Sequence, residues 1–194
     1  MPARKSDPRG SRTHGAAMRD ALLALRDLLD QMGIRWALIG GVAANLYRRK
    51  TRMTADVDLL LAADASERLT ELEASLVARG WSVLRGDPGG DLLRLRHGTF
   101  GSVDLQIAGT EYQRRAIERA RPASLGHSLE VPALSPEDVI VHKLIAERAK
   151  DIDDIEALLE ARISFDEAYV EYWAEFWGRT DLWQRIRSGS THSP

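Results

Sequence analysis

The chain has 194 residues, with 44% hydrophobic and 29% charged, as expected for one soluble globular domain or one domain with a small helical appendage. Its net charge of −2 at pH 7 gives no general attraction to nucleic acid, so a nucleic-acid substrate would need a local basic patch. The absence of cysteine excludes disulfides, thiolate zinc sites and cysteine nucleophiles, and fits a cytoplasmic protein. No apolar run approaches membrane-spanning length, and residues 1–15 lack the apolar core of a signal peptide.

Hydrophobic periodicity and turn residues divide the chain into elements. Residues 1–15 and 188–194 are rich in small and polar residues and are expected to be disordered tails. Between them, residues 16–134 are expected to form a mixed α/β core and residues 135–187 a helical C-terminal part. In chain order, the expected elements are helix 16–32, strand 34–39, helix 40–47, strand 57–61, helix 66–79, strands 81–85, 92–97 and 102–108, helix 111–119, extended segment 128–131, and helices 136–149, 152–161, 165–177 and 181–187.

The first chemical signal is Asp56 and Asp58, at the head of the apolar strand 57–61. Side chains two residues apart on a strand share a face, and two carboxylates are costly to place together unless a cation lies between them. Oxygen ligands of this kind suit Mg²⁺ or Mn²⁺, which also bind substrate phosphates. The alternative is a solvated strand end, and Asp151 and Asp153 repeat the same spacing elsewhere.

Asp104 is the candidate for a third carboxylate. It alternates with Val103, Leu105 and Ile107, so it lies on the opposite face of its strand from these apolar residues. If this strand neighbours 57–61, Asp104 reaches the same metal and accepts a proton from an attacking hydroxyl. A solvent-facing aspartate is the simpler alternative.

Gly40 and Gly41 follow a strand and open a helix, where a phosphate can approach free backbone N–H groups. A basic cluster at residues 48–52 follows, and Arg52 shares its alternating phase with Thr54 and Asp56. These features predict a triphosphate site, although a tight turn and a solvated basic loop are the alternatives.

The last dense region is residues 139–159. Lys143 lies in an apolar helix turn, where it either extends to solvent or contacts a phosphate. Asp151 and Asp154 are one helical turn apart and, as a bare pattern, favour helix capping. His142 has no partner in the sequence that would mark it as a ligand. An aromatic stripe from Phe165 to Trp183 favours helix packing over base stacking. 

Four blocks together resemble nucleotidyltransferases of the DNA polymerase β type, and most closely the AbiEii-like toxins of type IV toxin–antitoxin systems. They span roughly residues 38–159: Gly40-Gly41-x-Ala43, Arg52-x-Thr54-x-Asp56-x-Asp58-Leu59, Lys143-Leu144-x-Ala146, and Lys150-Asp151-x-x-Asp154-Ile155. The resemblance implies a small mixed β-sheet with flanking helices.

It further implies Mg²⁺ and triphosphate at the glycine motif and the aspartate pair. Lys143 would contact phosphates, and Asp151 or Asp154 would support the site. One departure is Gly41, where many such enzymes have serine. The chain is also short for the toxin branch.

The sequence therefore predicts a metal-dependent nucleotidyltransferase. An NTP would bind at Gly40, Gly41, Arg52, Thr54 and Lys143, with metal at Asp56, Asp58 and Asp104. Three interpretations of its role stay open. They are a toxin that modifies RNA such as tRNA and is held by a cognate antitoxin, an enzyme that modifies a small molecule such as an aminoglycoside or lincosamide, and a non-catalytic nucleotide-binding module.

Overall fold

The computed structural model describes residues 8–54, 56–86, 91–126 and 129–189, with side chains described from residue 15. Its helices are α1 (Pro8–Gln31), α2 (Gly40–Asn45), the 3₁₀ turn η1 (Ala63–Arg68), α3 (Leu69–Ala78), α4 (Glu111–Arg119), α5 (Pro136–Ala146), α6 (Ala149–Glu160), α7 (Glu167–Phe176) and α8 (Thr180–Arg187). Its strands are β1 (Trp36–Ile39), β2 (Val57–Leu61), β3 (Ser82–Arg85), β4 (Leu92–His97), β5 (Gly101–Ile107), β6 (Arg121–Ser124) and β7 (Glu130–Ala133).

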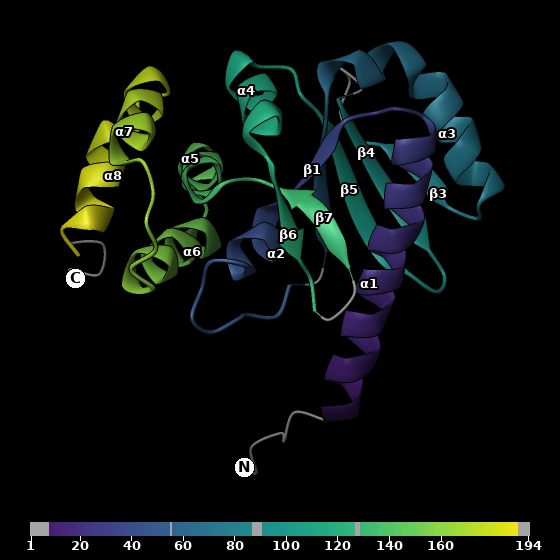
Figure 1. The fold of residues 1–194 in the computed structure, drawn as a ribbon, viewed down its shortest axis with the longest axis horizontal. Coiled ribbons are helices and arrows are strands. Elements are labelled where there is room, and N and C mark those ends of the chain that lie inside the picture. Colours follow the sequence, from purple (N-terminus) through teal and green to yellow (C-terminus); the bar gives the residue numbers. More distant parts are fainter. Residues whose placement is uncertain (1–7, 55, 87–90, 127–128, 190–194) are drawn as a thin grey trace.

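The described strands form one mixed sheet in the order β3-β4-β5-β2-β1-β7-β6. β2 runs parallel to β5, and β1 runs parallel to β7, whereas the other neighbours are antiparallel. Figure 1 shows α1 and α3 on one side of the sheet and α5 to α8 on the other. This mixed sheet with flanking helices and a helical C-terminal part is the predicted fold class.

Alternation along β5 divides the sheet into two faces. Val103, Leu105 and Ile107 are buried, whereas Asp104 and Gln106 are only partly covered. The apolar residues join a core in which Leu22, Leu25 and Leu29 of α1 are almost completely buried. The core therefore fixes the position of β2 and β5, while the polar residues of these strands remain on the opposite face.

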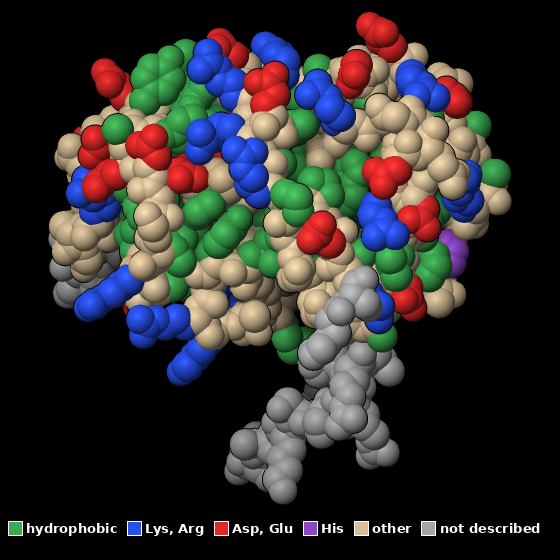
Figure 2. Space-filling view, viewed as in Figure 1, with side chains coloured by type: hydrophobic (Ala, Val, Ile, Leu, Met, Phe, Trp, Pro, Cys, Tyr) green, Lys and Arg blue, Asp and Glu red, His purple; other side chains and the backbone are tan. Residues whose placement is uncertain are grey.

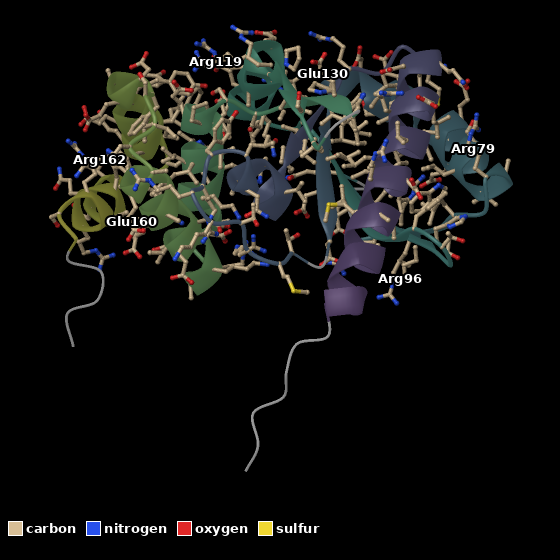
Figure 3. The ribbon with its side chains drawn as sticks, turned by 60° about the horizontal axis from the view of Figure 1, so that its bottom comes forward. Arg79, Arg96, Arg119, Glu130, Glu160 and Arg162 are labelled. Carbon is tan, nitrogen blue, oxygen red and sulfur yellow. The ribbon has the colours of Figure 1, made fainter. Side chains whose placement is uncertain are left out.

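The helical part is packed by aromatic side chains. Trp173 and Trp183 are buried, which confirms the predicted packing role of these members of the stripe, whereas Tyr172 and Phe176 are exposed. Figure 3 shows charged side chains at the periphery, with Glu160 and Arg162 on the helical side and Arg79 and Arg96 on the side of the sheet. Figure 2 shows acidic and basic side chains interspersed over one face of the molecule. No helix in the described part of the chain has the length and apolar character needed to span a membrane.

Several boundaries differ from the sequence predictions. The first helix begins at Pro8 and not at residue 16, so residues 8–15 are helical and the predicted tail is wrong there. Proline suits the first position of a helix because its missing N–H has no partner there anyway. The rest of that predicted tail and residues 190–194 of the other predicted tail lie outside the described residues.

β6 was not predicted, because Pro122 and Pro132 make both strands of its hairpin unlike ordinary strands. Proline is tolerated here because β6 is an edge strand. The predicted helix 136–149 also ends early. Glu147 adopts a left-handed conformation with φ of 52°, and Arg148 is extended before α6 begins. This break turns Arg148 toward the polar face of the sheet.

Candidate active site

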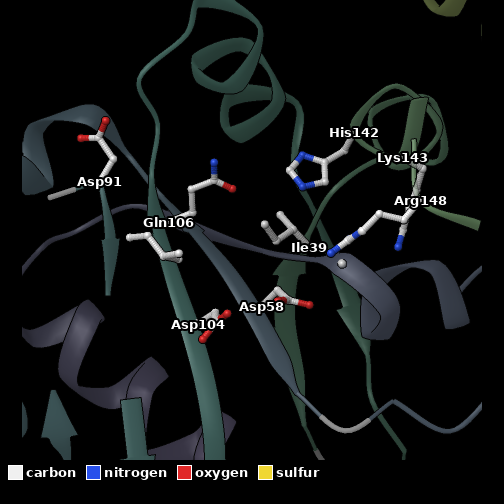
Figure 4. Close-up of a pocket in the computed structure, with 10 residues that line it drawn as sticks. Ile39, Asp58, Asp91, Asp104, Gln106, His142, Lys143 and Arg148 are labelled. Atoms are coloured by element: carbon white, nitrogen blue, oxygen red, sulfur yellow. The ribbon is translucent and has the colours of Figure 1, made fainter. Parts of the chain in front are cut away.

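Two of the predicted carboxylates lie opposite each other. β2 and β5 pair in a register that aligns Asp58 with Asp104, and both side chains lie on the face away from the apolar core. Within the described residues, neither carboxylate accepts a hydrogen bond. Figure 4 shows the two side chains next to each other on neighbouring strands. The structure therefore brings together a carboxylate pair with unused acceptor capacity.

The pKa values of both carboxyls are raised. Burial, together with the nearby charge of Asp104, raises the pKa of Asp58 to about 6. Burial also raises the pKa of Asp104, and Arg94, its partner across β4 and β5, opposes that rise. A divalent cation between the carboxylates would relieve this repulsion.

Asp56 occupies a different position from this pair. It is exposed, and its backbone carbonyl accepts a hydrogen bond of 2.8 Å from the Thr54 hydroxyl. Within the described part of the chain, no group of three or more histidine or acidic side chains is placed to hold a metal ion. The protein thus supplies Asp58 and Asp104 as a facing pair. Mg²⁺ usually binds through one or two carboxylates plus substrate phosphates, so this donor set fits such an ion.

Gly40 lies against the carboxylate of Asp58. Its φ is +68°, a left-handed conformation, and a Cβ at this position would lie 2.0 Å from Asp58 Oδ2. Gly41 opens toward Arg52 and Thr54, with a hypothetical Cβ at 3.1 Å from Arg52 Nη2. Gly40 therefore has to be glycine for both conformation and space, and the double glycine directly borders the carboxylate pair.

A buried ion-pair network holds the predicted basic residues. Lys143 Nζ lies 2.7 Å from Asp151 Oδ1 and 2.8 Å from Asp154 Oδ2, and all three side chains are almost completely buried. Arg52 binds both oxygens of Asp154 at 2.7 Å, and Arg48 contacts the same carboxylate at 2.5 Å.

The two aspartates of this network stay ionised. Burial raises the pKa of Asp154, but hydrogen bonds from Arg52 and Lys143 outweigh this effect and hold it below its ordinary value. For Asp151, hydrogen bonds from Arg148 and Lys143 outweigh burial in the same way. The final sequence block therefore anchors the cations of the site, and both aspartates take part.

Two adjoining cavities open around the carboxylates. The smaller, of about 210 Å³, is lined by Arg52, Thr54, Asp56, Lys150 and both glycines. The larger, of about 320 Å³, extends past Ile39 and Gln106 to Asp91 and is shown in Figure 4. Both cavities share the residues Gly40, Asp58, Asp104, Lys143 and Arg148. One cavity is thus rich in cations, and the carboxylate pair lies where the two meet.

Several lining residues were not identified from the sequence. Gln106 follows Asp104 in the same alternating phase, so the strand pattern contained the signal that would place it on this face. His142 precedes Lys143 on α5 and also lines the larger cavity, although no ligand partner for it could be identified from the sequence. Arg148 was predicted to lie inside the helix 136–149, but the break between α5 and α6 comes earlier and leaves Arg148 just before α6.

Comparison with protein families identifies the chain. Residues 18–171 match the model described as "Nucleotidyltransferase of unknown function (DUF6036)". The chain belongs to this family. It is a nucleotidyltransferase, and the match includes all the carboxylates and cations described above. This confirms the predicted enzyme class, whereas the AbiEii-like toxin assignment stays a prediction. Among curated proteins, none matches the chain.

Solved structures share the fold of this DUF6036 protein. An antigenic nucleotidyltransferase-like protein from Paracoccidioides brasiliensis superposes with a TM-score of 0.56 and 19% identity, covering 92% of this chain and 98% of that one. The antibiotic-resistance factor ANT(2'')-Ia gives 0.52 and 18%, covering 93% and 98%. The Megavirus polyadenylate synthase gives 0.50 and 13%, covering 86% of this chain and 40% of that one. At these identities the likeness is one of fold.

Proposed function

We propose that this enzyme transfers a nucleoside monophosphate from an NTP to an acceptor hydroxyl in a metal-dependent reaction. The observation that carries the proposal is the position of the Asp58–Asp104 pair between a basic cavity and a second open cavity. Phosphoryl transfer requires charge neutralisation on one side and access for the acceptor on the other. Both requirements are met around the same two carboxylates.

The smaller cavity is the proposed triphosphate site. Its lining includes four cationic residues, Arg52, Lys143, Arg148 and Lys150, and the small residues Gly40 and Gly41. Cationic side chains neutralise phosphate oxygens, with arginine especially suited to bidentate contact. The contacts of Asp154 with Arg52 and Lys143 hold these cations in place before the nucleotide binds. In this proposal, Lys143 and Arg52 contact the phosphates, which is the role predicted for them from the sequence.

Asp58 and Asp104 are the proposed metal ligands. Asp56, two residues before Asp58, is proposed to join the metal coordination when substrate phosphates complete it. Bound Mg²⁺ or Mn²⁺ would stabilise the charge that develops on the transferred phosphoryl group. Asp104 accepts the proton of the acceptor hydroxyl, whose oxygen bonds to the α-phosphorus. The bond between the α-phosphorus and the bridging oxygen breaks, and pyrophosphate leaves. The protein contributes mainly positioning and electrostatics.

The proposed acceptor is an RNA 3′ hydroxyl, such as that of tRNA, in a toxin–antitoxin system. Arg148 and Lys150 are exposed at the smaller cavity, and Arg49 and Lys50 are exposed shortly before Arg52 in the chain, so they could supply the local basic surface that an RNA would need. A cognate antitoxin would be the protein partner in this setting. Expression of the enzyme alone should then arrest bacterial growth.

A small hydroxylated acceptor is the second candidate, and the larger cavity favours it. Asp91 extends the acidic lining beyond Asp58 and Asp104, and a volume of about 320 Å³ falls in the range of small-molecule sites. The protein ANT(2'')-Ia, an antibiotic-resistance factor, has the same fold over nearly its whole length. Expression of the enzyme should then protect bacteria from the drug and should not arrest their growth.

A transfer assay distinguishes these candidates. Each labelled NTP is incubated with the protein, Mg²⁺ and either total bacterial RNA or a panel of aminoglycosides and lincosamides. Label in RNA with the wild-type protein, but not with Asp58→Asn, supports the toxin. Label in a small molecule supports the second candidate. An exposed neighbour of the ion-pair network, Asp153, provides the matched control Asp153→Asn. Nucleotide binding without transfer to either acceptor class would favour the non-catalytic module.

A further inference from the structure

The two cavities of the site meet at the carboxylate pair, and few residues line both of them. These shared residues are Gly40, Asp58, Asp104, Lys143 and Arg148. With the triphosphate in the smaller cavity and the acceptor in the larger one, the phosphorus atom that passes from donor to acceptor lies at this junction. Lys143 and Arg148 are the two cations among the shared residues.

Lys143 and Arg148 differ in how freely a substrate can reach them. The Lys143 side chain is 3% exposed, and its ammonium lies 2.7 Å from Asp151 and 2.8 Å from Asp154. The Arg148 side chain is 60% exposed, and its ion-pair partner within the described residues is Asp151. A phosphate can therefore contact the guanidinium of Arg148 directly, whereas Lys143 is enclosed by the protein.

Asp151 holds the guanidinium of Arg148 by one edge. Arg148 Nε donates to Asp151 Oδ2 at 2.5 Å, and Nη2 donates to Asp151 Oδ1 at 3.2 Å. The remaining nitrogen, Nη1, has no hydrogen-bond partner within the described part of the chain. A guanidinium is planar and carries five N–H groups, so this contact fixes its plane and leaves Nη1 and one N–H of Nη2 free to donate to a ligand.

The backbone between α5 and α6 positions Arg148 for this contact. Glu147 ends α5 in a left-handed conformation, and Arg148 is extended, with φ of −83° and ψ of 154°. Asp151, in the first turn of α6, also accepts a hydrogen bond of 3.3 Å from the backbone N–H of Arg148. One buried carboxylate thus holds both the backbone and the guanidinium of Arg148.

The side chain of Arg148 extends toward the carboxylate pair. Figure 4 shows it reaching from the helical part toward Asp58. The pKa of Arg148 is raised, first by its hydrogen bond with Asp151 and to a smaller degree by the charge of Asp58. The guanidinium therefore lies within electrostatic reach of the residue that is proposed to hold the metal.

We propose that Arg148 is a catalytic residue that binds a non-bridging oxygen of the α-phosphate, the group that is transferred. This inference rests on the nucleotidyl transfer proposed above. Arg52 and Lys150 line the smaller cavity but not the larger one, so they are assigned to the β- and γ-phosphates, which leave as pyrophosphate.

A contact at this oxygen acts mainly on the reaction step. As the acceptor oxygen bonds to the α-phosphorus and the bond to the bridging oxygen breaks, charge is redistributed over the phosphate oxygens, while the acceptor proton passes to Asp104. A guanidinium that is already oriented interacts more strongly with this transition state than with the bound NTP. Loss of Arg148 should therefore lower kcat more than it raises KM.

The test compares Arg148→Ala and Arg148→Lys with the wild type in Mg²⁺-dependent transfer to the acceptor that takes label in the assay above. In Arg148→Ala, kcat should fall by about 10²-fold or more, the scale of losing one preorganised donor, while KM for the NTP changes by less than about threefold. Arg148→Lys should recover little of this loss, because an ammonium lacks the planar fork that holds Asp151 and reaches the phosphate together.

α-Thio nucleotides report on the contact itself. Sulfur in place of a non-bridging oxygen weakens a hydrogen bond at that position, and the two diastereomers place sulfur at different oxygens. The ratio of their transfer rates should differ about tenfold between the wild type and Arg148→Ala, in which the contact is already absent. A side chain that only stabilised the fold would lower both rates equally and leave this ratio unchanged.

Two further variants serve as controls. Lys150→Ala should weaken the binding of pyrophosphate and raise KM without altering the diastereomer ratio, whereas both Arg148 variants should bind pyrophosphate as the wild type does. Arg185→Ala removes an exposed arginine of α8 outside both cavities and should match the wild type in every assay. If the wild type transfers label, an unchanged kcat or an unchanged diastereomer ratio in Arg148→Ala overturns the inference alone. A wild type that transfers label to no acceptor overturns the proposed function and the inference with it.

Discussion

Gly40 lies directly against the side chain of Asp58, so a larger residue at position 40 would collide with this carboxylate. A Cβ at Gly40 would lie 2.0 Å from Asp58 Oδ2 and 2.9 Å from Asp58 Cβ, so no movement of the carboxylate alone would accommodate it. β1 and β2 pair these segments directly, with Ile39 opposite Asp58. Gly40, which follows β1 and opens α2, thus leaves the space that the site carboxylate occupies.

Gly40→Ala should displace Asp58 and destabilise the protein. The left-handed φ of +68° adds a conformational penalty of about 1 kcal/mol or more to the steric conflict. We expect nucleotidyl transfer to fall by about 10²-fold or more, since a major electrostatic stabiliser is misplaced. Steady-state transfer rates and thermal unfolding measure the two effects.

Gly41→Ala is the control for this change. Its Cβ would meet the flexible end of Arg52 at 3.1 Å and Thr54 at 3.3 Å, and no left-handed φ is involved. The loss of stability should therefore be smaller than for Gly40→Ala. Equal effects of the two substitutions would show that the contact with Asp58 is not what requires glycine at position 40.

Asp58→Asn should stabilise the metal-free protein while it removes activity. The folded protein holds a proton on Asp58 up to a pH of about 6, whereas the ordinary carboxyl pKa is 3.8. Between these values the folded state binds more protons than the unfolded state, so stability falls as pH rises. The charged carboxylate then costs about 1–3 kcal/mol at neutral pH, which asparagine avoids. Functional sites commonly carry such a cost.

Thermal melting at pH 7.5 measures this effect in the presence of a chelator. The melting temperature of Asp58→Asn should lie above that of the wild type, and Asp153→Asn should melt like the wild type. Added Mn²⁺ should then raise the melting temperature of the wild type more than that of Asp58→Asn. A variant that melts below the wild type without metal would contradict the assignment of Asp58 as an uncompensated charge.

The same carboxyl should make metal affinity depend on pH. A proton on Asp58 competes with the cation, so Mn²⁺ affinity should fall as pH decreases through about 6, by up to about tenfold per pH unit below it. Titration of Mn²⁺ binding by electron paramagnetic resonance at pH 5 to 8 checks this. The pH dependence should weaken strongly in Asp58→Asn. A flat profile in the wild type would exclude Asp58 as the titrating ligand.

Much of the fold could be predicted because its core strands have strong local patterns. The bounds of β2, β4 and α4 agree with the prediction, since each has a clear period of two or a capped helical pattern. β6 could not be predicted in the same way, because proline lowers the strand signal and only the edge position makes it acceptable. The break at Glu147 depends on a left-handed residue other than glycine, which no sequence rule indicates.

The carboxylate site was predictable to the extent that it follows strand alternation. Asp104 was placed on the polar face from its apolar neighbours, and the register with Asp58 agrees. The partners of Asp154 could not be inferred, because Arg48 and Arg52 are more than a hundred residues away in the sequence. Long-range ion pairs have no local pattern, so the capping role suggested by the sequence gave no indication of this network.

Asp154 offers the sharpest test of that network. Its carboxylate is completely buried and contacts Arg48, Arg52 and Lys143, so Asp154→Ala would remove the acidic partner of both arginines and leave Lys143 with Asp151 alone. Removing one partner of a buried ion pair costs about 3–5 kcal/mol. Urea unfolding should show a loss of this size. The neighbouring Asp153→Ala, at an exposed position, should change stability by less than about 0.5 kcal/mol.

The same substitution tests whether Asp154 holds the phosphate-binding cations in place in addition to stabilising the fold. Without Asp154, Arg52 and Lys143 lose the contacts that hold them at the smaller cavity, and tripolyphosphate should bind more weakly than to the wild type. Asp154→Asn keeps the shape and some of the hydrogen bonds, so it should retain more stability than alanine but still weaken phosphate binding. If Asp154→Asn bound tripolyphosphate as tightly as the wild type, the buried carboxylate would serve only to pair the two helices with the loop after α2. The phosphate contacts would then have to come from Arg148 and Lys150, whose exposed side chains do not depend on Asp154.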